Sequence, residues 1–110
     1  MNRTKLRKLE AAGWRVGSAR EFLKLSPEES ALVEMKLRLS DALRARRTAL
    51  RLSQHTLARR LRSSQSRVAK MEAADPTVSF DLLVRGLLAL GAGAREVARA
   101  IRGVGRKAAA

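Results

Sequence analysis

The chain has no cysteine and very few aromatic residues. Two phenylalanines, one tryptophan and no tyrosine account for 3% of its 110 residues. Without cysteine, the chain can form neither a disulfide framework nor a thiolate metal site. Hydrophobic residues nevertheless make up 45% of the sequence. A chain of this length and composition predicts one compact domain with an aliphatic core.

Long apolar runs are also absent. No segment approaches the roughly 20 apolar residues of a membrane-spanning helix, and the N-terminus lacks the apolar stretch of a signal peptide. The basic, amphipathic segment 94–107 has no Trp or Phe to insert into a membrane interface. We therefore expect a soluble cytoplasmic protein that does not bind membranes.

Acidic residues are scarce. There are 10 Asp and Glu against 24 Lys and Arg, which gives a formal net charge of +14. Such an excess favours a polyanionic partner, above all nucleic acid. Proteins that bind single-stranded RNA usually stack its bases on aromatic side chains. The shortage of aromatic residues therefore makes RNA a weak candidate and favours double-stranded DNA.

The residues needed for catalysis are missing as well. His55 is the only histidine, and it has no cysteine to share a metal with. Glu28 and Glu29 are neighbours, so on a helix they point in different directions. The segment GAGAR at Gly91 lacks the Lys-Ser/Thr signature of a phosphate-binding loop. We predict no enzyme, no metal and no cofactor.

The apolar residues follow helical spacing, and no useful strand pattern occurs. Ser26-Pro27-Glu28-Glu29 has the form of a capping box with proline at the first helical position. A helix should follow to about Leu50, or break near Ser40. Further helices are expected after Thr4, after Ser18, after Ser53, after Ser63 or Ser64, from Phe80 to Leu90, and from Ala94 to Arg102. The predicted fold is all-α, a compact bundle of short helices.

One break between helices is unusual. In SQHTLARRLRSSQSRVAKMEA, residues 53–73, two short apolar patterns flank Arg62-Ser63-Ser64. Two short helices joined by a tight turn form a helix-turn-helix, which places its second helix in the DNA major groove. Ala58 provides the small residue at the crossing. The apolar anchors are Leu57, Leu61, Val68 and Met71. The side chains suited to base readout are Gln65, Ser66, Arg67 and Lys70.

This motif resembles the XRE-type helix-turn-helix family, the lambda-repressor and Cro-like regulators, over about residues 39–90. The resemblance implies that Gln54 contacts the DNA backbone and that Gln65, Ser66 and Lys70 face bases. It also implies a structural pair between Arg47 and Glu72. We further expect phosphate contacts from Ser64, Arg59 and Arg62. The chain would then comprise N-terminal accessory helices (1–25), the DNA-binding domain (26–92), and a C-terminal helix with a basic tail (93–110).

Two positions depart from the family pattern. The family usually has glycine in the turn, where this chain has Arg62, and often just past the second helix, where it has Ala74. If the turn keeps a left-handed backbone, a residue other than glycine costs on the order of 1–2 kcal/mol there. A contact between Arg62 and phosphate could offset that strain.

The segment Phe80–Leu90 is apolar around too much of its circumference for one buried stripe. One side could face a second subunit, since family members commonly dimerise. The candidates for the dimer surface are Leu82, Leu83, Leu87, Leu88 and Ile101. Alternatively, Trp14, Phe22 and the N-terminal helices cover that side.

Two functions follow from the resemblance. The first is a sequence-specific regulator of double-stranded DNA, acting as a dimeric repressor of its own or other genes. The second is a HigA-type antitoxin, which represses its operon and also neutralises an RNase toxin. Residues 1–25 could contact such a toxin.

Overall fold

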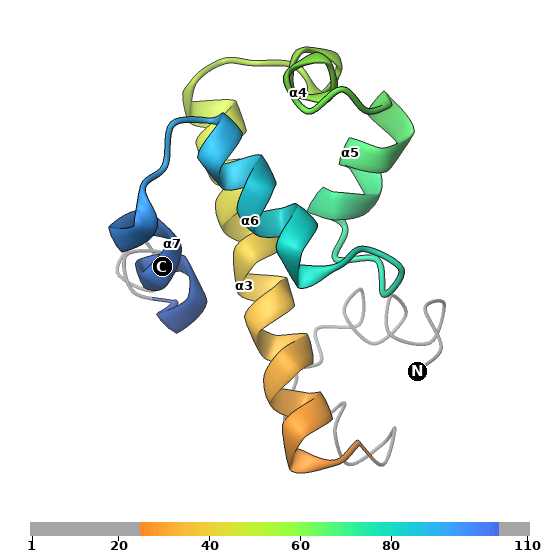
Figure 1. The fold of residues 1–110 in the computed structure, drawn as a ribbon, viewed down its shortest axis with the longest axis vertical. Coiled ribbons are helices and arrows are strands. Elements are labelled where there is room, and N and C mark those ends of the chain that lie inside the picture. The colour runs from red at the N-terminus through yellow and green to blue at the C-terminus, as the bar shows by residue number, and fades with distance from the viewer. Residues whose placement is uncertain (1–24, 104–110) are drawn as a thin grey trace.

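The computed structural model describes residues 25–103, which form helices without any strand (Figure 1). The helices are α3 (Pro27–Ala49), α4 (Gln54–Arg60), α5 (Gln65–Glu72), α6 (Phe80–Ala89) and α7 (Ala94–Arg102). None of these is long and apolar enough to cross a membrane. The helices expected after Thr4 and Ser18, with Trp14 and Phe22, lie outside the described residues, as does the basic tail.

Helix α3 begins at the predicted capping box and runs without a break. The Ser26 hydroxyl accepts a hydrogen bond from the Glu29 amide at 3.1 Å, and the Glu29 carboxylate accepts one from the Ser26 amide at 3.0 Å. These bonds satisfy amides that would otherwise lack partners in the first turn. The alternative of a break at Ser40 is wrong, because Ser40 lies inside the continuous 23-residue helix.

Serine side chains also begin the next three helices. Ser53, Ser64 and Ser79 each accept a hydrogen bond from the amide three residues later, at 3.1 to 3.2 Å. Ser64, rather than Ser63, is therefore the cap of α5. Each cap is local in sequence, so these helix starts follow directly from residue type and spacing.

The core lies between α3, α5 and α6, with α4 packed against α5 and α6. The apolar side chains that are fully buried there are Leu39, Leu43, Leu57, Val68, Met71 and Leu83. Helices α5 and α7 both pack against α3, and Figure 1 shows them on opposite sides of it. Because α3 contacts α5, α6 and α7, it fixes the position of α5 relative to the other two helices.

Two residues predicted for the dimer surface belong to this core. Leu83 is 0% exposed and Leu87 is 3% exposed. Their prediction as dimer residues is wrong, because α6 turns this side towards α3 within the same chain. Leu88 is 50% exposed, while Leu82 and Ile101 are half-buried against the core.

Three helices end in a left-handed residue that is not glycine. Arg51 follows α3 with φ of 57°, Arg62 follows α4 with 53°, and Ala74 follows α5 with 55°. The turn thus keeps the left-handed backbone despite carrying arginine. Each such residue costs about 1–2 kcal/mol relative to an ordinary conformation.

Candidate nucleic-acid interface

Apolar contacts hold the two helices of the motif in a fixed crossing. Leu57 and Ala58 on α4 are buried, as are Val68 and Met71 on α5. The Ser63 amide donates to the Ala58 carbonyl at 2.8 Å, which closes the turn. Because both helices are anchored on their inner faces, the outer face of α5 is held rigidly towards solvent.

The outer face of α5 carries the residues predicted to read bases. Ser66, Arg67 and Lys70 are exposed, whereas Gln65 is half-buried beside α4. Ala69 is half-buried and follows Gln65 by four residues, so the two lie on the same side of the helix. The sequence analysis did not single out Ala69, although a methyl group here would suit contact with a thymine methyl.

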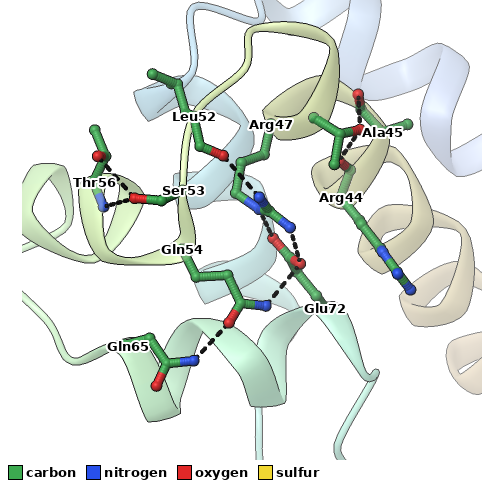
Figure 2. A network of polar contacts seen from close by, with 10 residues as sticks. Arg44, Ala45, Arg47, Leu52, Ser53, Gln54, Thr56, Gln65 and Glu72 are labelled. Atoms are coloured by element: carbon green, nitrogen blue, oxygen red, sulfur yellow. Dashed lines mark hydrogen bonds and ion pairs between the residues drawn. The ribbon is translucent and has the colours of Figure 1, made fainter.

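Behind this face lies a polar network from three helices (Figure 2). Arg47 of α3 donates two hydrogen bonds to the Glu72 carboxylate, at 2.5 and 2.9 Å, and a third to the Leu52 carbonyl at 2.7 Å. The Arg47 and Glu72 side chains are only 13% and 5% exposed. This is the pair that the resemblance implies, and it ties the end of α5 to α3.

The pair also fixes its own charge state. Burial raises the pKa of the Glu72 carboxyl, but the hydrogen bonds from Arg47 and Gln54 and the charges of Arg47 and Arg44 outweigh burial, so the pKa is lowered. The hydrogen bonds with Glu72 likewise raise the pKa of Arg47. Both groups therefore stay ionised at neutral pH.

The network continues to the reading face. The Gln54 amide nitrogen donates to Glu72 Oε1 at 3.1 Å, and the Gln65 amide nitrogen donates to Gln54 Oε1 at 2.6 Å. A residue predicted to contact phosphate is thus bound directly to one predicted to read a base. Spacing along the chain gave no sign of this contact.

The other predicted phosphate ligands lie on exposed surface. Arg59, Arg62 and Ser64 are all exposed. The Ser64 hydroxyl oxygen accepts a hydrogen bond from the Arg67 amide, so the hydroxyl hydrogen of Ser64 is still available to donate. Arg51, which the sequence analysis did not select, is exposed just before α4. An arginine just after a helix, as at Arg62, is the sequence feature that could have marked Arg51 as a further phosphate ligand.

A family model for helix-turn-helix proteins matches residues 43–102, more than half of the chain. The chain belongs to the XRE-type helix-turn-helix family. No curated protein and no solved structure matches it. XRE-type proteins are regulators that bind double-stranded DNA, not enzymes, and their fold is the all-α, lambda-repressor-like bundle predicted from the sequence.

Within this XRE-type domain, α4 and α5 are the two helices of the motif. The family match begins at Leu43, inside α3, and ends at Arg102, the last residue of α7. Helix α7 therefore lies within the matched range.

Proposed function

We propose that this XRE-type regulator reads a specific DNA sequence and acts as a dimeric repressor, including of its own gene. The observation that carries the proposal is the outer face of α5. There, Ser66, Arg67 and Lys70 are free to reach base edges, and Gln65 is already oriented by Gln54. An ordered polar face on a rigid helix is what direct readout in the major groove requires.

The proposed backbone contacts surround this face. Arg59 and Arg62 would pair with phosphates, while Ser64 and Gln54 would each donate one hydrogen. Gln54 uses one amide hydrogen for Glu72 and keeps the second. Such contacts set the register of the protein on DNA and make its affinity depend on salt.

Dimerisation rests on Leu88, with Leu82 and Ile101 beside the core. A leucine that is 50% exposed on α6 loses contact with water when a second copy covers it. A two-fold dimer would place two recognition helices in successive major grooves, one helical turn of DNA apart. Leu88→Glu should give a monomer in sedimentation, whereas a dimer that persists would place the interface elsewhere.

Fluorescence anisotropy on the DNA upstream of the gene and on a shuffled duplex, across a salt series, tests the main proposal. Tighter binding to the upstream DNA that persists at physiological salt supports sequence-specific autorepression. Equal binding to both duplexes that disappears with salt contradicts it, since the charge of +14 would then provide only phosphate attraction.

A second candidate is the antitoxin role, favoured by an apolar hollow along the N-terminal half of α3. The hollow, of about 360 Å³, is lined by Leu25, Leu32, Val33 and Leu37 together with Pro76, among others. Leu32 is 46% exposed there and takes no part in the helix-turn-helix. Co-expression with the product of a neighbouring short reading frame, followed by affinity capture, tests this role. Capture lost in Leu32→Asp would locate the contact, and failure to capture any toxin would exclude the role.

A further inference from the structure

The polar network behind α5 has a direction. Its hydrogen bonds run from Gln65 to Gln54 and from Gln54 to Glu72, with the amide nitrogen as the donor at each step. Arg47 donates to both oxygens of the same carboxylate, and Oε1 accepts from Arg47 and Gln54 together. This series of hydrogen bonds therefore ends at the Arg47–Glu72 ion pair, which joins α3 to α5.

Glu72 imposes this direction by its chemistry. An ionised carboxylate can only accept hydrogen bonds, so Gln54 must turn its amide nitrogen towards it. The Gln54 oxygen then faces the other way, towards Gln65. Gln65 can satisfy that oxygen only with its own amide nitrogen. One carboxylate therefore fixes the orientation of two amides in succession.

The orientation decides what Gln65 offers to DNA. Its oxygen and one amide hydrogen remain free, which is one acceptor and one donor. Adenine presents the complementary pair in the major groove, an N6 donor and an N7 acceptor, whereas guanine presents two acceptors. If the hydrogen bonds ran in the opposite direction, with Gln54 donating to the Gln65 oxygen, Gln65 would instead offer two amide hydrogens. That pattern suits guanine.

We propose that Glu72 is a positioning residue for specificity. Acting through Gln54, it makes Gln65 select adenine over guanine. This inference rests on the proposed function, in that Gln65 must read a base. It gives Glu72 a role beyond stabilising the fold, because a purely structural role would affect all DNA sequences alike.

The test compares four duplexes that differ at one base pair. A preferred site is first selected from random duplexes, and the pair read by Gln65 is the one at which Gln65→Ala abolishes preference. Anisotropy then gives the affinity of the full-length protein for each base there. The wild type should prefer adenine over guanine by about 5- to 100-fold. In Glu72→Gln the ratio should fall to within about threefold, because a neutral amide permits both orientations.

Two further variants guard against loss of the fold. Gln54→Met removes the link while leaving the Arg47–Glu72 pair in place, so the adenine-to-guanine ratio should also fall in a folded protein. Glu96→Gln makes the same chemical change at the start of α7, where Glu96 caps Gly93 at 3.1 Å. It should keep the wild-type ratio. Circular dichroism verifies that each variant is folded, and if Glu72→Gln unfolds, Gln54→Met decides.

The outcomes distinguish failure of the role inferred for Glu72 from failure of the proposed sequence-specific binding. Collapse of the ratio in Gln54→Met, and in a folded Glu72→Gln, with Glu96→Gln unchanged, supports the inference. A full adenine preference in Gln54→Met, an equal loss of affinity on all four duplexes, or a wild-type preference for guanine overturns it. If the wild type binds selected and random duplexes equally, the proposed sequence-specific function fails, and the inference fails with it.

Discussion

Helices α5 and α7 are alike in size and charge but differ in how their polar side chains are held. Both are short, pack against α3 and carry basic residues outward. On α7, Arg95, Arg99 and Arg102 are exposed, and no hydrogen bond or ion pair joins their side chains to another described residue. On α5, Gln65 and Glu72 are linked to α3 and α4. Positive charge attracts DNA wherever it lies, whereas distinguishing one base from another requires directional contacts with base edges.

The largest expected difference is in how firmly the two helices are anchored. Met71 of α5 is fully buried, whereas Val97 of α7 is 8% exposed. Met71→Ala should lower the free energy of unfolding by about 2–5 kcal/mol, because it leaves a cavity in the core. Val97→Ala removes less buried surface and should cost roughly 1–2 kcal/mol. Urea denaturation measures both, and equal losses would contradict the proposed contrast in anchoring.

Acid should weaken the attachment of α5 more than that of α7. The pKa of Glu72 is lower in the folded protein than its ordinary value of 4.5, so the unfolded chain binds more protons in acid. The stability from the Arg47–Glu72 pair is thus present above pH 4.5 and is lost as the pH falls through the folded pKa. Urea midpoints measured down to about pH 3 should show this loss.

The matched variants are Glu72→Gln and Glu96→Gln. The pKa of Glu96 is also lowered, chiefly by backbone hydrogen bonds, but this glutamate is exposed. Glu72→Gln should remove more of the acid sensitivity than Glu96→Gln. The contrast would be refuted by an unchanged pH profile in Glu72→Gln.

Sequence discrimination should depend on α5 and the polar network behind it, and not on α7. Gln65→Ala or Ser66→Ala should cost about 1–3 kcal/mol of discrimination at one base pair, since a bidentate or polar base contact is lost. Arg99→Gln on α7 should leave discrimination intact. Anisotropy on the selected site and its single-base variants measures both, and wild-type discrimination in the two α5 variants would disprove the base-reading assignment.

Salt dependence separates phosphate contacts from charge elsewhere. If Arg59 and Arg62 each contact a phosphate, Arg59→Gln with Arg62→Gln should make the plot of log affinity against log salt shallower by about 0.9 for each lost contact. Arg95→Gln with Arg102→Gln removes the same charge from α7 and should change the slope much less. Equal changes in slope would mean that α7 also lies against the duplex.

The smallest effect concerns the left-handed helix ends. Arg62→Gly and Ala74→Gly both relieve strain, which the flexibility of glycine in the unfolded chain partly offsets, so each should gain at most about 1 kcal/mol. The gain should be smaller at Ala74, whose methyl is buried. Only Arg62→Gly should weaken DNA binding. Thermal unfolding and anisotropy on both variants would show whether Arg62 is retained for its contact.

The parts of the fold set by local chemistry were predictable from the sequence. Ser26, Ser53 and Ser79 each cap a helix through a bond that spans three residues, so residue type and spacing suffice. The motif could be predicted for the same reason, because its anchors recur at fixed spacing. The resemblance left open whether the turn keeps a left-handed backbone at Arg62 or differs slightly, and the structure has the left-handed backbone.

The parts set by packing between distant segments were not predictable in this way. Periodicity showed that α6 is apolar on several sides but not which side α3 covers, so Leu83 and Leu87 were assigned to the wrong surface. The Gln54–Gln65 contact depends on the crossing of α4 and α5, which places two side chains together at a geometry that no local pattern specifies. Arg47 and Glu72 are 25 residues apart, and only the resemblance linked them.

The left-handed helix ends also predict a pattern of mutational tolerance. Glycine is normally among the least tolerated substitutions in a helical protein. At positions 51, 62 and 74 glycine should instead be among the best tolerated substitutions. A library selected for folding alone should therefore accumulate glycine there. A parallel library selected for DNA binding should exclude glycine at whichever arginine touches DNA. Sequencing the two populations would therefore separate residues retained for binding from those whose replacement by glycine is tolerated.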